Sequence, residues 1–278
     1  MNDLFSFDVD GLKIIIKEGE GLSVFGTANA GKSELLYNIF NRKKGVLYRG
    51  IVSRFSVEET ALFNSEIGYY DGSLYGDPEE PVSILVSNSA HVFGVEPKQI
   101  LNAFEIAPDD LKLKLKQADE WLNLKLGLLN ELSKEYKLLF IDDVFGLDYG
   151  LKRRLVPMLL HIKKQLSMNF VIATNDVEFA GILTDKILVL HEGHMVEYGA
   201  VKAITETPMH PYTKWLMDST KLVINRENRF FGDFDAKAGK KNCRFCHVCP
   251  YSSAECKSVV PPIKVTSTGS YCACNLKL

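Results

Sequence analysis

The chain has 278 residues, of which 46% are hydrophobic and 24% are charged, a composition typical of globular proteins and not of disordered or fibrous ones. Its 33 Lys and Arg residues against 35 Asp and Glu residues leave a net charge of -2, which gives no support to nucleic-acid binding. At this length we expect one large domain or two unequal domains.

The sequence carries no signal for export or for membrane insertion. No run of about 18 consecutive apolar residues occurs. Residues 1–5 lack the basic start and long apolar run of a signal peptide. We therefore expect a cytoplasmic protein. All six cysteines lie between positions 243 and 274, and in a reducing compartment such clustering favours a metal over disulfides.

Short apolar runs alternate with helical patterns over residues 1–220, which predicts an α/β fold with a largely parallel sheet covered by helices on both faces. The predicted strands are 22–25, 137–141, 170–173 and 186–190. Apolar residues at helical spacing predict a helix over 151–166, which completes a strand, helix, strand unit. Residues 226–241 are polar and rich in Gly, Lys and Asn, and they predict a linker before the cysteines.

A phosphate-binding motif follows the first of these strands. Residues 26–33 match G-x-x-x-x-G-K-[ST] in full, with an apolar strand before them and a predicted helix over 34–40 after them. Such glycines let backbone N–H groups and the positive end of the helix surround phosphate oxygens. A chance glycine-rich turn is the alternative, and the coincidence of strand, motif and helix argues against it. The predicted phosphate-binding residues are Gly26, Thr27, Ala28, Asn29, Ala30, Gly31, Lys32 and Ser33.

Two of these side chains and one later carboxylate have specific roles in the prediction. Lys32 is expected to neutralise the β- and γ-phosphates, and the Ser33 hydroxyl is expected to hold Mg²⁺. Asp142 ends the apolar strand 138–141, at the sheet edge where ligands bind, and we expect it to supply the second magnesium contact. A solvated acidic turn is the alternative for Asp142, and its pairing with the phosphate motif favours the functional interpretation.

The order of the motifs resembles that of ATP-binding cassette (ABC) nucleotide-binding subunits. Residues 146–148 (Gly-Leu-Asp) resemble the D-loop of that family, 174–176 lie where its switch segment lies, and 192–199 resemble its closing hairpin. A narrower resemblance follows at 208–216, Pro-Met-His-Pro-Tyr-Thr-Lys-Trp-Leu, which is similar to a segment of the dipeptide, oligopeptide and nickel importer subfamily. The cysteine-rich tail is similar to that subfamily as well.

Several catalytic positions depart from the family pattern. Asp143 stands where the family has the glutamate that polarises the attacking water, and Asn175 replaces the switch histidine. The signature Leu-Ser-Gly-Gly-Gln is missing, with 118–124 in the corresponding region, and no glutamine follows 67–70. Losing a positioned base typically costs about 10²–10⁴ in rate. We therefore expect weak hydrolysis, with Asp143 and Asn175 as the remaining catalytic candidates.

The resemblance also predicts the domain organisation. A nucleotide-binding domain is expected over 1–220, with a trimmed helical subdomain at about 72–133. A cysteine-cluster extension is expected over 221–278.

The cysteine spacing is C-x2-C-x2-C-x6-C from Cys243 to Cys256, followed by Cys272-x-Cys274. Thiolates at this density favour tetrahedral zinc or an iron–sulfur cluster. The resemblance implies a [4Fe-4S] cluster held by Cys243, Cys249, Cys256 and Cys274. Cys246 and Cys272 are then spare or alternative ligands, or they join Cys249 and Cys274 in a zinc site. Such closed sites are usually structural.

The function implied by the resemblance is that of an ATP-binding subunit of a peptide- or nickel-type importer, binding Mg²⁺ and ATP on the inner face of the cell membrane. Its implied partners are a second ABC nucleotide-binding subunit, two membrane permease subunits and, indirectly, an extracytoplasmic solute-binding protein. The missing motifs suggest the degenerate half of a heterodimer. A noncatalytic assembly or regulatory subunit is the alternative, and a soluble metal–sulfur regulator is a third.

Overall fold

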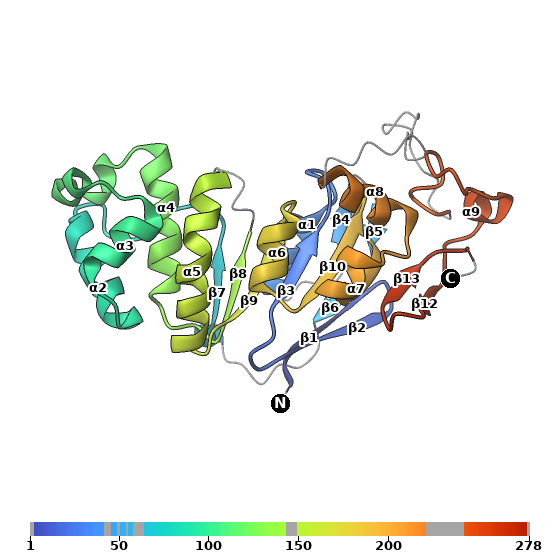
Figure 1. Cartoon of the computed structure of the whole chain (residues 1–278), viewed down its shortest axis with the longest axis horizontal. Helices are drawn as coiled ribbons and strands as arrows, with labels where there is room; N and C mark the ends of the chain where they lie inside the picture. The colour runs from blue at the N-terminus through green and yellow to red at the C-terminus, as the bar shows by residue number, and fades with distance from the viewer. Residues whose placement is uncertain are drawn as a thin grey trace.

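The computed structural model of the protein describes residues 3–41, 46–48, 51–53, 55–57, 64–142, 149–220 and 242–276. Within these ranges eight strands form the central sheet, in the order β12-β13-β11-β10-β3-β9-β8-β7 (Figure 1). Strands β10, β3, β9, β8 and β7 are parallel, and the other three join antiparallel at one edge. Their bounds are β3 Leu22–Phe25, β7 Ile67–Tyr70, β8 Leu138–Ile141, β9 Asn169–Thr174, β10 Lys186–His191, β11 His194–Ala200, β12 Ile263–Val265 and β13 Tyr271–Ala273. All four predicted strands are confirmed.

The apolar runs form central strands because both faces of the sheet are covered. Along β8, Leu138 and Phe140 pack into one buried cluster, whereas Leu139 and Ile141 pack into another on the opposite face. Helix α1 (Lys32–Phe40) contributes to the first cluster, and α5 (Tyr149–Gln165) and α6 (Val177–Leu183) contribute to the second. The predicted helices at 34–40 and 151–166 are thereby confirmed.

A smaller antiparallel sheet lies against the α1 side. Within the described residues it has the order β2-β1-β6, and side chains of β1 and β2 share a buried cluster with those of α1. The bounds are β1 Asp3–Val9, β2 Leu12–Lys17 and β6 Phe55–Val57, and a separate hairpin is formed by β4 Val46–Tyr48 and β5 Ile51–Ser53.

A helical subdomain lies between β7 and β8 and forms one end of the molecule (Figure 1, left). Its elements are α2 Val82–Phe93, α3 Pro97–Phe104, the 3₁₀ turns Pro108–Lys112 and Leu115–Gln117, and α4 Glu120–Leu132. A Cβ at Gly127 of α4 would lie 2.5 Å from the Ser73 carbonyl oxygen, so glycine lets the loop after β7 cross this helix closely. The Tyr70 hydroxyl donates to the Leu124 carbonyl at 2.6 Å and ties the end of β7 to α4.

The cysteine-bearing segment continues the central sheet at the opposite end (Figure 1, right). Strand β13 pairs with β11, and a Cβ at Gly199 would lie 2.7 Å from the Cβ of Ser270. Between β11 and β12 the chain forms α7 Val201–Glu206, α8 Pro211–Thr220 and α9 Ala254–Ser258. The predicted linker at 226–241 lies outside the described residues. No helix in the described part of the chain is both long enough and apolar enough to span a bilayer.

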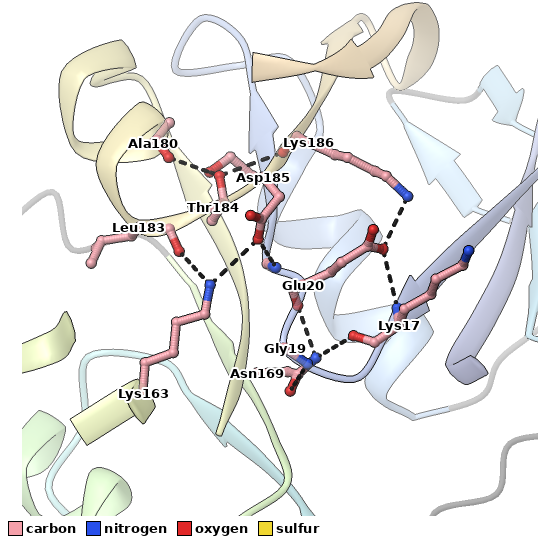
Figure 2. A network of polar contacts seen from close by, with 12 residues as sticks. Lys17, Gly19, Glu20, Lys163, Asn169, Ala180, Leu183, Thr184, Asp185 and Lys186 are labelled. Atoms are coloured by element: carbon pink, nitrogen blue, oxygen red, sulfur yellow. Dashed lines mark hydrogen bonds and ion pairs between the residues drawn. The ribbon is translucent and has the colours of Figure 1, made fainter. Parts of the chain in front are cut away.

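One buried amide joins the turn before β3 to the start of β9 (Figure 2). The Asn169 side chain is 1% exposed. Its Oδ1 accepts from the Gly19 N–H at 3.2 Å, and its Nδ2 donates to the carbonyls of Lys17 at 2.6 Å and Glu20 at 2.9 Å. Since β3 leads directly into the phosphate motif, this clamp fixes where that motif begins.

Replacing this amide should destabilise the fold without touching the phosphate motif. We expect Asn169→Ala to lower the free energy of unfolding by about 1–3 kcal/mol, because buried backbone groups lose their partners. Asn169→Asp keeps the acceptor for Gly19 but loses both donated bonds, so it should also destabilise. Urea unfolding measures the stability of both variants, and Asn102→Ala on the exposed face of α3 is the control. Equal urea midpoints for Asn169→Ala and the control would contradict a stabilising role for the Asn169 hydrogen bonds.

Candidate functional site

The phosphate motif forms the connection between β3 and α1, as predicted. Gly31 precedes α1 with φ 92°, a left-handed conformation that favours glycine. Gly26 is required for a different reason. A Cβ there would lie 2.6 Å from the Leu190 carbonyl oxygen and 2.7 Å from the Ala30 Cβ. The Gly193 N–H donates to the Ala30 carbonyl at 2.7 Å, so the loop is held against the end of β10.

Lys32 lies within the concave side of this loop. Its side chain is buried, and Nζ donates to the carbonyls of Thr27 at 2.7 Å and Gly26 at 3.1 Å. These carbonyls hold the ammonium group beside the backbone N–H groups that would receive a phosphate. A triphosphate would replace them as the partner of Nζ, because an ammonium ion binds an anion more strongly than a neutral carbonyl.

Asp142 follows β8 and is brought to the same edge. Its Oδ2 accepts from the Tyr69 hydroxyl at 2.7 Å. Burial raises the pKa of Asp142, and this effect is opposed by hydrogen bonds from Tyr69 and Ser33 and by the charge of Lys32. The structure therefore brings the two predicted magnesium ligands, Ser33 and Asp142, together.

The residues present fit a magnesium ion. Oδ1 of Asp142 is buried and has no hydrogen-bond partner within the described residues, so it is available as a metal ligand. The Ser33 hydroxyl and the Asp142 carboxylate would hold the ion. When bound, Mg²⁺ supplies positive charge that neutralises the β- and γ-phosphate oxygens. Tyr69 was missed by the sequence analysis, although its position at the end of β7, beside β8, placed it next to Asp142.

The remaining predicted catalytic positions are only partly described. Asn175 follows β9 and is exposed, next to Asp176, whose carboxylate caps α6 by accepting from the Phe179 N–H at 3.0 Å. Asp143 and the segment 146–148 lie outside the described residues.

Residues 118–124, the region expected to correspond to the signature, contain a capping carboxylate. Asp119 caps α4, where its Oδ1 accepts from the Leu122 N–H at 2.7 Å, and Glu120 adds a second acid in the first turn. The amino end of α4 is therefore already satisfied and negatively charged, which disfavours an approaching phosphate.

Phe5, Phe7 and Val9 of β1 are core residues. Phe5 is 2% exposed and Phe7 and Val9 are 0% exposed, packed with α1 and the central sheet. None of these three side chains is placed to stack on a base at the surface.

The six cysteines are free thiols in one region, but no coordination shell is formed. The Cys243 N–H donates to the Cys256 carbonyl at 2.9 Å. The pKa of Cys243 is raised to about 12, mainly by burial and in smaller part by the nearby thiols of Cys246, Cys256 and Cys274. Among the described residues, no group of three or more His, Cys, Asp or Glu side chains is arranged to hold a metal ion.

A separate groove of about 750 Å³ lies near the amino ends of the strands, the edge of the sheet opposite to the phosphate loop. Its lining includes Lys137 and Lys163, which form ion pairs with Glu66 at 2.6 Å and Asp185 at 3.4 Å. Because these charges are compensated by neighbouring carboxylates, the groove is a weaker candidate for a phosphate compound than the loop.

Two histidines, the partly buried His191 and the buried His210, lie beside the phosphate loop on its β10 side. Burial lowers the pKa of His191 to about 4 and that of His210 to about 3. His210 Nδ1 accepts from the Tyr212 N–H at 3.0 Å, which requires the unprotonated nitrogen. Both rings contact Phe245, so they form part of the contact between the cassette and the cysteine segment.

Comparison with known proteins covers both the tail and the whole chain. The family described as "Oligopeptide/dipeptide transporter, C-terminal region" matches residues 196–256. The oligopeptide transport ATP-binding protein OppF of Lactococcus lactis is 24% identical over 84% of this chain and 80% of its own length. OppF of Escherichia coli is 22% identical over 92% of this chain and 84% of its own length.

The fold is also similar to solved structures. The structure of cbiO1 from Clostridium perfringens, part of the ABC transporter complex cbiONQ, covers 82% of this chain and 98% of its own length at a TM-score of 0.55 and 17% identity. This likeness shows the fold of an ABC-type P-loop ATPase, as the sequence predicted.

The lowered pKa values of His191 and His210 should make the fold sensitive to acid. An unfolded histidine titrates at about 6.5, so below that pH the unfolded chain takes up protons that the folded chain refuses. Stability should therefore fall as pH decreases from about 6.5 toward the lowered pKa values. His210→Asn, whose amide oxygen can replace Nδ1 as acceptor, should show a shallower fall in urea unfolding. His91→Asn on the exposed face of α2 is the control, and an unchanged slope in His210→Asn would refute this assignment.

Proposed function

Because the family match at 196–256 and the full-length relatives confirm the resemblance to ATP-binding subunits of ABC peptide importers, we propose that this chain is such a subunit. It binds Mg²⁺ and ATP at the carboxyl edge of the sheet and couples nucleotide binding to solute uptake. It works at the inner face of the cell membrane. The observation that carries the proposal is the juxtaposition of Lys32, Ser33 and Asp142 around one phosphate loop.

Each residue of this site has a physical task in the proposal. The backbone of residues 26–33 surrounds the phosphates, and Lys32 leaves the carbonyls of Gly26 and Thr27 to neutralise them. Ser33 and Asp142 hold Mg²⁺. Asp143 is the remaining group that can orient or deprotonate water, with Asn175 as a weaker hydrogen-bond donor at the γ-phosphate.

We propose that the chain is the degenerate half of a heterodimer. In ABC subunits the signature donors close over the nucleotide bound by the opposite subunit. Here Asp119 and Glu120 occupy the corresponding helix end, and a carboxylate cannot stabilise the charge that develops on phosphate. The partner's nucleotide site would lack these donors, whereas this chain's own site could still receive an intact signature from the partner.

The proposed assembly contains a second ABC nucleotide-binding subunit and two permease subunits, and through them it meets an extracytoplasmic solute-binding protein. The relatives support this assembly only through their described role in oligopeptide transport. A noncatalytic assembly or regulatory subunit is the second candidate, favoured by the self-capped amino end of α4.

Two substitutions separate binding from hydrolysis. We expect Lys32→Ala to weaken Mg·ATP binding by at least tenfold, because the cation that balances the phosphates is lost. Asp143→Asn should leave binding unchanged and lower ATPase turnover of the purified transporter complex by about 10²–10⁴ if this chain catalyses. Lys98→Ala in α3 is the control for a lost surface charge. Unchanged turnover in Asp143→Asn would favour the noncatalytic subunit.

We also propose a metal cluster in the tail, namely a [4Fe-4S] cluster held by Cys243, Cys249, Cys256 and Cys274. The donor set fits a soft metal because six thiols lie between positions 243 and 274 and several interact electrostatically, although their positions do not form a coordination shell. When bound, the metal would fix the segment in one conformation. Zinc is the alternative occupant, with Cys246 and Cys272 as alternative ligands.

Anaerobic purification followed by metal analysis distinguishes these occupants. A cluster predicts iron and acid-labile sulfide in equal amounts, lost in Cys256→Ala and retained in Cys246→Ala. Zinc without sulfide would support the zinc site, provided that the zinc is lost in Cys246→Ala and in Cys272→Ala. Protein free of both metals would refute a metal in this tail.

A further inference from the structure

The tyrosine of the His-Pro-Tyr-Thr motif contacts the phosphate loop directly. Tyr212 is fully buried in the first turn of α8. The Thr27 N–H donates to its hydroxyl oxygen at 3.3 Å, and the Thr27 hydroxyl lies 3.5 Å from the same oxygen. The contact joins residues that are 185 positions apart in the chain.

The other end of the Thr27 backbone is held by the motif lysine. Lys32 Nζ donates to the Thr27 carbonyl at 2.7 Å. Thr27 is therefore fixed from two directions, with Tyr212 at its N–H and Lys32 at its carbonyl. When Lys32 turns to a phosphate, its contact with Thr27 is lost, whereas the contact from Tyr212 can persist. Tyr212 can then keep the first half of the loop in place during binding.

Tyr212 is itself held by a buried carboxylate through a short series of hydrogen bonds. Glu197 of β11 is 0% exposed and accepts from the N–H groups of Met209 at 2.9 Å and His210 at 3.0 Å. His210 Nδ1 then accepts from the Tyr212 N–H at 3.0 Å. These bonds fix the backbone that enters α8, so the Tyr212 ring has little freedom to move away from the loop.

The ring of Tyr212 also contacts the cysteine segment. Phe245, between Cys243 and Cys246, is 1% exposed and packs edge-to-face on Tyr212, with ring centroids 5.3 Å apart and an interplanar angle of 64°. The Phe245 carbonyl accepts from the Cys249 N–H at 3.1 Å. The backbone that carries these cysteines therefore contacts Tyr212 through the Phe245 side chain. Tyr212 in turn contacts Thr27.

We infer that Tyr212 is a positioning residue for the phosphate loop. Through Phe245 the cysteine segment holds Tyr212 in place, so the conformation of this segment sets nucleotide affinity. The inference rests on the proposed function in assuming that the loop binds Mg·ATP. It adds a physical connection between the tail and the nucleotide site, carried by Phe245, Tyr212 and Thr27.

The first test removes one oxygen atom. Tyr212→Phe keeps the ring and loses the hydroxyl, and we expect Mg·ATP to bind the full-length protein about two- to tenfold more weakly by calorimetry. The Thr27 amide should exchange with deuterium faster in the same variant without nucleotide. Tyr251→Phe, at an exposed tyrosine of the cysteine segment, should leave both readouts at the wild-type values. Wild-type affinity in Tyr212→Phe would overturn the inference.

The deuterium-exchange readout separates this inference from the proposed function. If the wild-type protein fails to bind Mg·ATP, the proposed function fails, and exchange at Thr27 still decides the role of Tyr212. Faster exchange in Tyr212→Phe supports positioning, and unchanged exchange overturns it. A different result would leave the proposed function standing and overturn this inference. In that result the wild type binds Mg·ATP, Lys32→Ala does not, and Tyr212→Phe binds with wild-type affinity.

The second test asks whether Phe245 acts through Tyr212. Phe245→Leu removes the edge-to-face contact, and it should weaken Mg·ATP binding and accelerate Thr27 exchange. In the Tyr212→Phe background it should add little, because the contact to Thr27 is already lost. Val260→Leu, at an exposed site in the same region, is the matched control. Full additivity of the two substitutions, or no effect of Phe245→Leu alone, would overturn the role of Phe245.

Discussion

The site depends on close packing between the first residues of the phosphate loop and the end of β10. Gly26 has no room for a side chain beside the Leu190 carbonyl, and the Ala30 carbonyl is bonded to the Gly193 N–H. The loop therefore takes its shape from a neighbouring parallel strand as well as from its own sequence. Under the proposed function, this packing would preserve the shape of the phosphate loop independently of the residues at the catalytic positions.

The sequence predicted the parts of the fold that local pattern determines. Strands buried on both faces, such as 138–141, are continuous apolar runs, and the phosphate motif has a fixed spacing. Contacts between distant segments could not be predicted in this way. Nothing local signals that Tyr69 bonds Asp142, that Tyr212 reaches Thr27, or that β13 joins β11. The burial of Phe5 and Phe7 could not be predicted either, because the sequence of β1 does not reveal which of its side chains face the core.

If the proposed function holds, the side chains that the site has kept and those that it has lost differ in their physical role. The groups that bind ground-state phosphate are present and well packed, including Lys32 and the backbone of the loop. In the proposed correspondence with ABC subunits, the groups that act on charge developing during hydrolysis are altered, and the acids Asp119 and Glu120 lie at the start of α4. Selection on binding alone would leave such a pattern, because ground-state affinity and transition-state stabilisation use different atoms.

The late pairing of β13 with β11 has a consequence for how the molecule is made. Until residues 271–273 leave the ribosome, β11 presents an unpaired sheet edge, and such edges recruit strands from other chains. The edge of β11 thus gains its protection against self-association only after β13 has been synthesised.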